Sequence, residues 1–375
     1  MRLTARGLNR ATLARQMLLR RETLDVVEAV RRLVALQAQS AASPYLALWN
    51  RLTDFDPADL DAAFVDHRVV KASLIRLTLH SVHAADYPEF HNAMVPSLRA
   101  SVLYDDRFKS TGLSAADADA LVPHLAKFTA QPRRGAEIED MLEARLGERK
   151  PRVWWALRRF APLHHAPTGG PWSFGERASF TSAQTKDSSR DESEEGLVLR
   201  YLQAFGPASI PDFSQFTILR RPVVSRAVGA LGDQVEEVEG PDGAKLYDVL
   251  GAPLPAEDTP APPRLLPMWD NVLLAYFDRS RVIPPDYRPL VIKRNGDVLP
   301  TLLVDGYVAG VWRPVDGGIE ATAFHRLDDG TWDGLAAEAR ALVAFLAGRD
   351  PKVYSRYAHW WNKWFPSAEI RVLRG

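Results

Sequence analysis

The chain has 375 residues, of which 46% are hydrophobic and 25% are charged, and its formal net charge is zero. This length predicts two to four compact units, and the composition is typical of a soluble globular protein without a membrane span or a signal core, which favours a cytoplasmic location. The absence of cysteine excludes disulfides, thiolate metal sites and a thiol nucleophile.

Charge is distributed in blocks, although the total is neutral. Residues 1–50 hold eight arginines against three acids, and residues 145–177 hold seven lysines or arginines against two acids. Neutrality argues weakly against a nucleic-acid partner, but such blocks can present one positive face, which is enough for phosphate contacts. For any single block, a solvated helix face is the plainer interpretation.

The first predicted unit covers residues 9–83, with three helices and then a hairpin-like segment over 69–80. Gln37-Ala38-Gln39 lies within it, where an apolar helical segment approaches a break at Pro44. On a regular helix, positions i and i+2 point roughly 200° apart, so both carboxamides cannot serve one site there. If they act together, the helix has to end or distort at Gln37.

The same order of elements is predicted twice more along the chain. Residues 114–182 contain helices over 136–146 and 152–160 and a wing around 168–172. The clearest repeat, 194–250, contains helices over 194–205, 208–217 and 220–231. Its strands, 234–239 and 245–249, are joined by Gly240-Pro241-Asp242-Gly243, a strong hairpin turn. Three helices followed by a hairpin describe a winged helix.

We therefore predict an α+β fold with three tandem winged-helix units and a small β-rich, barrel-like C-terminal domain. The expected boundaries are 1–110, 111–187 and 188–250 for the winged helices, 251–263 for a Pro-rich linker and 264–375 for the last domain. A helix is expected over 333–347, after several Gly-containing turns.

The common signatures of cofactor chemistry are missing from the sequence. His80 with His83, and His164 with His165, have no acidic partners at metal-binding spacing. There is no Gly-rich phosphate loop and no Gly-x-Ser-x-Gly elbow. We therefore expect no cofactor and no metal, and any catalysis has to use side chains and water.

Several motifs together resemble one enzyme family. Gln37-Ala38-Gln39 after an Arg-rich N-terminal segment is similar to the signature of the AlkZ-type bacterial DNA glycosylases, and further segments fit along residues 8–348. They include Ser43-Pro44-Tyr45-Leu46-Ala47-Leu48-Trp49, Arg76-Leu77-Thr78-Leu79-His80, Ala204-Phe205-Gly206-Pro207-Ala208-Ser209 and Leu303-Val304-Asp305-Gly306-Tyr307. Several relatives have Gly in place of Leu77 and acidic-Phe-Asp in place of Met268-Trp269-Asp270, a segment we expect near the DNA-facing side.

The resemblance implies a monofunctional DNA glycosylase that excises bulky N7-alkylguanine. The two-glutamine form resembles the branch that unhooks azinomycin-type interstrand crosslinks in self-resistance. Gln37 and Gln39 are then the catalytic residues that position a water for attack at C1′. The implied partner is double-stranded DNA carrying an alkylated purine, bound by a monomer in the nucleoid.

Basic residues near the proposed site and on the third unit are candidates for DNA contacts. They are Arg20, Arg21, Arg31, Arg32, Lys71, Arg76, Arg220, Arg221, Lys293 and Arg294. Recognition helices in tandem arrays often pack internally, and the turn at 293–296 has a plain surface role as an equal alternative.

Two other functions stay open at this point. A non-catalytic winged-helix regulator would bind a specific operator and form a two-fold dimer. A drug-sequestering resistance protein would bind the free toxin without DNA.

Overall fold

The computed structural model describes residues 2–185, 188–362 and 365–375, and its elements follow a mixed α/β order. The helices are α1 Ala5–Arg15, α2 Val26–Arg32, α3 Ser43–Trp49, α4 Pro57–Val65, α5 Tyr87–Leu103, α6 Asp106–Lys109, α7 Ala115–Phe128, α8 Gly135–Leu146, α9 Pro151–Phe160, α10 Arg190–Phe205, α11 Ile210–Thr217, α12 Arg221–Ala230, α13 Arg288–Val291 and α14 Asp329–Ala347. The strands are β1 Leu36–Gln37, β2 Val69–Ser73, β3 Leu79–His83, β4 Arg133–Arg134, β5 Leu163–Ala166, β6 Ser179–Ser182, β7 Val235–Glu239, β8 Lys245–Val249, β9 Arg264–Leu266, β10 Thr301–Val304, β11 Tyr307–Val315, β12 Gly318–Ala323 and β13 Glu369–Arg374.

The segment expected to form the clearest unit contains the expected elements. Helices α10, α11 and α12 are followed by the antiparallel pair β7–β8. Capping boxes at Ser189 and Ser209 start the first two helices: each serine hydroxyl accepts from the N3 backbone N–H, and the N3 carboxylate accepts from the serine backbone N–H. The hairpin turn contains Asp242 and Gly243 at positive φ, the conformation that these residue types tolerate best.

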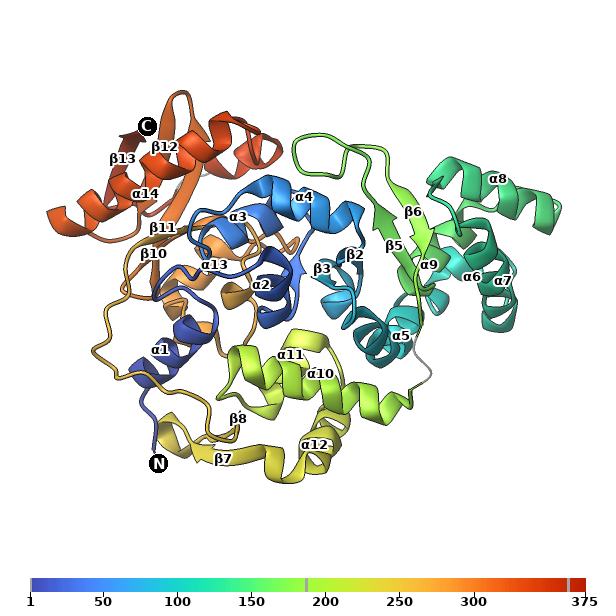
Figure 1. Cartoon of the computed structure of the whole chain (residues 1–375), viewed down its shortest axis with the longest axis horizontal. Helices are drawn as coiled ribbons and strands as arrows, with labels where there is room; N and C mark the ends of the chain where they lie inside the picture. The colour runs from blue at the N-terminus through green and yellow to red at the C-terminus, as the bar shows by residue number, and fades with distance from the viewer. Residues whose placement is uncertain (1, 186–187, 363–364) are drawn as a thin grey trace.

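The hairpins of the first two segments join into one sheet. Its strand order is β1-β3-β2-β5-β6-β4, and β2 meets β5 through the pair Lys71 and His165. Figure 1 shows β2 and β3 beside β5 and β6, with α5 and α9 against them. The hydrophobic core under this sheet also includes side chains of α10, α11 and α12, so the predicted units share buried surface.

The C-terminal sheet is open, which differs from the barrel-like domain expected from the sequence. Its order is β13-β12-β11-β10-β9, and within the described residues β9 and β13 lie at opposite edges. The last strand joins only after α14, which packs on β9, β12 and β13 and covers one face instead of letting the sheet close. This domain shares a continuous core with α1 to α4.

Met268-Trp269-Asp270, which we expected near the DNA-facing side, lies inside the molecule, so its side chains are not on the surface. These three residues are at most 4% exposed. Asp270 forms a bidentate ion pair with Arg51, with both N–O distances 2.8 Å and both side chains fully buried. The Arg51 Nε also donates to the Gln16 carbonyl at 2.9 Å.

A second buried ion pair ties α1 to the third segment. The two terminal nitrogens of Arg15 donate to Asp248 on β8 at 2.6 and 2.7 Å. Both side chains are at most 5% exposed. Buried ions of this kind require near-complete partnering, so the two pairs fix the N-terminal segment against both the third segment and the C-terminal domain.

Removing Asp270 should strongly destabilise the protein. Asp270→Ala leaves the Arg51 charge buried without its partner, which should lower the free energy of unfolding by about 3–5 kcal/mol. Urea denaturation followed by circular dichroism measures this. The matched control is Asp106→Ala, which removes an exposed pair with Lys109 and should cost less than about 1 kcal/mol. Equal losses in the two variants would contradict the prediction.

Candidate active site

The Gln37 segment is extended and not helical. Helix α2 ends at Arg32, Val34 has a positive φ of 68°, and Leu36–Gln37 then pairs antiparallel with β3. The Ala38 N–H continues the ladder by donating to the Leu79 carbonyl at 2.8 Å. The helix thus ends before Gln37, so the geometric obstacle that a regular helix posed to a shared site is absent, and Gln39 lies in a bend just after the strand.

The Gln37 carboxamide is buried and held by one arginine. Its Oε1 accepts from the Arg76 Nη2 at 2.7 Å, and the side chain is 6% exposed. A guanidinium can only donate, so this contact fixes which end of the carboxamide is oxygen. Among the described residues the Gln37 Nε2 has no hydrogen-bond partner in the protein. The carbonyl retains a second lone pair for another donor.

Arg76 is itself anchored at the end of the β2–β3 connection. Its Nη1 donates to the Phe216 carbonyl on α11 at 3.2 Å, and the guanidinium lies 5.3 Å from the Phe216 ring centroid. Arg76 and Leu77 both have positive φ, 52° and 60°. This conformation strains non-glycine residues, which gives a physical reason why glycine suits the Leu77 position.

His80 lies opposite Gln37 in the β1–β3 ladder and is completely buried. Burial, and then the Arg76 charge, lower the pKa of His80 to about 3. The imidazole is therefore neutral near pH 7. Its Nδ1 lies 3.2 Å from the Thr78 carbonyl, so Nδ1 carries the proton and Nε2, 3.4 Å from Arg76, is the acceptor.

Gln39 is exposed and lines a small open cleft. The cleft has a volume of about 180 Å³, and its other lining residues are Ser73, Leu79, Arg158, Arg159, His165, Ala178 and Phe180. No contact joins the Gln39 and Gln37 side chains within the described chain. The two carboxamides therefore share one short segment but face different surroundings, one buried against Arg76 and the other open to solvent.

Arg158 and Arg159 are basic residues of this cleft that the sequence reasoning did not single out. The Arg159 Nη1 donates to the Leu77 carbonyl at 3.0 Å. Partial burial lowers the pKa of both guanidinium groups. Neither forms an ion pair with a described carboxylate. The sequence feature that could have identified them is their position in the basic block 145–177, on the side of α9 opposite its buried apolar face.

Several residues expected to contact DNA are engaged elsewhere. Arg21 pairs with Glu338 at 2.7 Å, and Arg32 pairs with Glu22. Lys71 is 6% exposed, with its Nζ 4.3 Å from the Phe174 ring centroid. Burial lowers the pKa of Lys71 to about 8. These surroundings do not favour phosphate contacts by the three side chains.

The remaining candidates are more accessible. Arg20, Arg220, Arg221 and Arg294 are exposed, and Arg31 is exposed with its Nε 3.8 Å from Asp86. Lys293 stacks over the Trp360 and Phe365 rings at 5.3 and 5.0 Å. Arg76 is the one expected DNA contact that touches Gln37 among the described residues.

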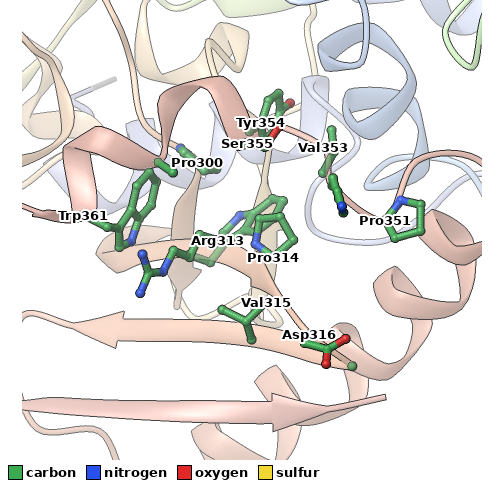
Figure 2. Close-up of a pocket in the computed structure, with 14 residues that line it drawn as sticks. Pro300, Arg313, Pro314, Val315, Asp316, Pro351, Val353, Tyr354, Ser355 and Trp361 are labelled. Carbon is green, nitrogen blue, oxygen red and sulfur yellow. The ribbon is translucent and has the colours of Figure 1, made fainter.

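A larger cavity lies elsewhere, in the C-terminal domain. Figure 2 shows this pocket of about 610 Å³, with Arg313, Pro314, Tyr354 and Trp361 among its lining residues. Neither Gln37 nor Gln39 lines it. The volume of a cavity therefore does not identify the active site here, and we place the candidate site at the glutamine segment.

The described residues contain no group of three or more His, Cys, Asp or Glu side chains placed to hold a metal ion. Within the same residues, no helix has the length and apolarity required to span a bilayer.

Comparisons with known proteins point to one family. The family model described as DNA glycosylase AlkZ-like matches residues 30–345. A Streptomyces sahachiroi protein named interstrand DNA cross-link repair glycosylase is 26% identical over 339 residues, covering 83% of this chain and 88% of that protein. The solved structure of Streptomyces sahachiroi DNA glycosylase AlkZ matches with a TM-score of 0.79 at 23% identity, covering 92% of this chain and 96% of that one.

The buried histidines make stability depend on acidic pH. The pKa of His80 and of His165 is lowered to about 3, and that of His91 and His164 to about 4, chiefly by burial. Below about pH 6.5 these histidines bind protons in the unfolded chain but stay neutral in the native protein. The free energy of unfolding should therefore fall as pH decreases. In chemical denaturation between pH 5.5 and 4.5, His80→Gln should flatten this dependence by about 1.4 kcal/mol per pH unit. An unchanged slope would contradict the assignment.

Proposed function

The chain belongs to the AlkZ-like DNA glycosylase family, and from that membership we propose that it excises bulky N7-alkylguanine from double-stranded DNA and unhooks interstrand crosslinks. It is a DNA glycosylase; the lesion class, the roles of the glutamines and a part in self-resistance to an azinomycin-type toxin are our proposals. We also propose that it acts as a monomer in the cytoplasm, associated with the nucleoid.

The end of helix α2 before the glutamine segment is the observation that supports this mechanism best. N7 alkylation places a positive charge on guanine and weakens its glycosidic bond, so the enzyme has to position water at C1′ and stabilise an oxocarbenium-like transition state. A carboxamide oxygen can accept from that water and direct its dipole toward the developing cation. Positioning and dipole stabilisation of this kind are worth several kcal/mol, on the order of 3 or more.

Arg76 has a positioning role in this mechanism. Its 2.7 Å hydrogen bond fixes the Gln37 carboxamide, and the remaining carbonyl lone pair is then available to the water. The Nε2 of neutral His80 lies 3.4 Å from the Arg76 Nη2 and can accept from it, and His80 supplies no proton at neutral pH. Gln39, in the open cleft, is the carboxamide that DNA can reach without any rearrangement.

The cleft also has the charge that a DNA backbone requires. Arg158 and Arg159 border it beside Gln39 without carboxylate partners among the described residues, which suits them to phosphates flanking the lesion. The three helix-and-hairpin segments are proposed to act as winged helices around this site. A crosslinked base cannot swing free of its duplex, and an open cleft accommodates that restriction.

Excision should depend on both carboxamides. Gln37→Ala and Gln39→Ala should each lower the single-turnover rate on N7-methylguanine duplex by about 10²–10³-fold, because each removes an oriented dipole or water contact. Alkali cleavage at the resulting abasic site measures the rate. Gln131→Ala, an exposed glutamine outside the cleft, is the matched control and should retain full activity. Absence of excision by the unmodified protein would refute the proposed function.

The two cleft arginines should act through DNA affinity. Arg158→Ala and Arg159→Ala should each weaken duplex binding and reduce the slope of log K against log salt by about 1, since each removes one phosphate contact. Fluorescence anisotropy at several salt concentrations tests this. Arg158→Lys retains the charge and should keep most of the slope. A slope equal to that of the unmodified protein in both alanine variants would exclude the contacts.

A further inference from the structure

Phe277 is an aromatic residue whose side chain is exposed to solvent. It is 59% exposed, whereas the adjacent Tyr276 is 1% exposed. Its backbone N–H donates to the Asp212 Oδ1 on α11 at 2.9 Å, which fixes the position from which the ring projects. A single exposed ring is ordinary on a protein surface, so the groups fixed around Phe277 decide whether it marks a binding site.

The backbone next to Phe277 is held in place by buried contacts of Tyr276 and Arg281. The Tyr276 hydroxyl donates to the Phe205 carbonyl at 2.8 Å and lies 2.7 Å from the Thr12 hydroxyl. Arg281 stacks on the Tyr276 ring at 4.1 Å and donates to the Pro207 carbonyl at 2.8 Å. These buried contacts come from α1 and from the α10–α11 connection, so little conformational freedom remains to be lost when the ring binds a partner.

One cation lies beside the exposed ring, and a second is close to it in the chain. The Arg221 guanidinium lies 5.8 Å from the Phe277 ring centroid. Arg279 is two residues further along, and burial together with the Arg288 charge lowers its pKa. Within the described chain, none of these three arginines forms an ion pair, and the neighbouring Asp278 carboxylate is occupied by the Ser280 N–H and hydroxyl, both at 2.9 Å. The surface therefore combines the aromatic ring with guanidinium groups and one carboxylate.

Helix α11 places this surface beside the glutamine segment. Its Asp212 holds Phe277, and its Phe216, four residues later, accepts from Arg76, which in turn holds Gln37. Positions i and i+4 lie on one helix face about 6 Å apart, so the two anchors are close. The Arg279 charge is also near enough to lower the pKa of Arg76.

We propose that Phe277 stacks on a nucleobase of the substrate duplex next to the lesion, while Arg221 and Arg279 contact the flanking phosphates. The proposal rests on the proposed function, since it assumes that DNA lies across the Gln37 segment. An aromatic face flanked by guanidinium groups matches the chemistry of a base between its phosphates. Stacking accepts any base, so this contact adds affinity and local unstacking without sequence preference.

Binding measurements on single variants test the stacking contact. Phe277→Ala should weaken binding to the N7-methylguanine duplex by about 10-fold with an unchanged salt slope, because no charge is removed, and Phe277→Trp should restore it. Arg221→Ala should instead reduce the slope by about 1. Tyr104→Ala, at an aromatic residue that is 74% exposed, is the matched control and should bind normally. Thermal melting establishes that each variant is folded.

A fluorescent base reports the contact directly. With 2-aminopurine beside the lesion, the full-length protein should change the emission on binding, and Phe277→Ala should abolish that change at saturating concentration. Equal affinity and equal emission in the two proteins would overturn the stacking role, as would a failure of the unmodified protein to bind duplex DNA. If Phe277-dependent DNA binding is found without base release, the excision chemistry fails and the stacking surface stands.

Discussion

The ion pair between Arg51 and Asp270 is the constraint on which the arrangement around the glutamines depends. Both groups are withdrawn from water, so each requires the other, and this requirement joins the end of α3 to the C-terminal domain. The next residue, Asn271, donates to the carbonyl of Ala35, one residue before β1. The C-terminal domain thus fixes the backbone that leads into Gln37, although more than 200 residues separate them in sequence.

Burial also organises the site itself. Gln37, Arg76 and His80 are buried or half-buried polar groups, and each forms a hydrogen bond with another member of the group or with a backbone carbonyl. Such a network holds side chains in place and does not supply strong acids or bases, as the low pKa of His80 illustrates. That character suits a reaction in which an already activated leaving group departs and water needs orientation.

Sequence patterns predicted local features well and long-range ones poorly. The elements of 190–249 were predictable because capping serines, apolar periodicity and a Gly-Pro-Asp-Gly turn act within a few residues of each other. The barrel-like closure was wrong because strand order depends on where β13 docks after α14. The sequence did not distinguish Arg158 and Arg159 from the rest of their basic block, because their place in the cleft depends on the packing of α9 beside the β2–β3 connection.

By itself, the sequence predicted the helices α10 to α12 and the β7–β8 hairpin, and its motifs resembled those of the family to which the chain belongs. Only the tertiary structure decided how that motif is presented. Local propensity favoured continuing helix α2 toward Gln37. Pairing with β3, more than 40 residues away, instead gives the backbone of Leu36 and Gln37 hydrogen bonds that only an extended conformation can form. Arg76 then became the partner of Gln37 because both were buried by the same fold. Hydrogen bonds between distant residues decide such choices, and no local pattern encodes them.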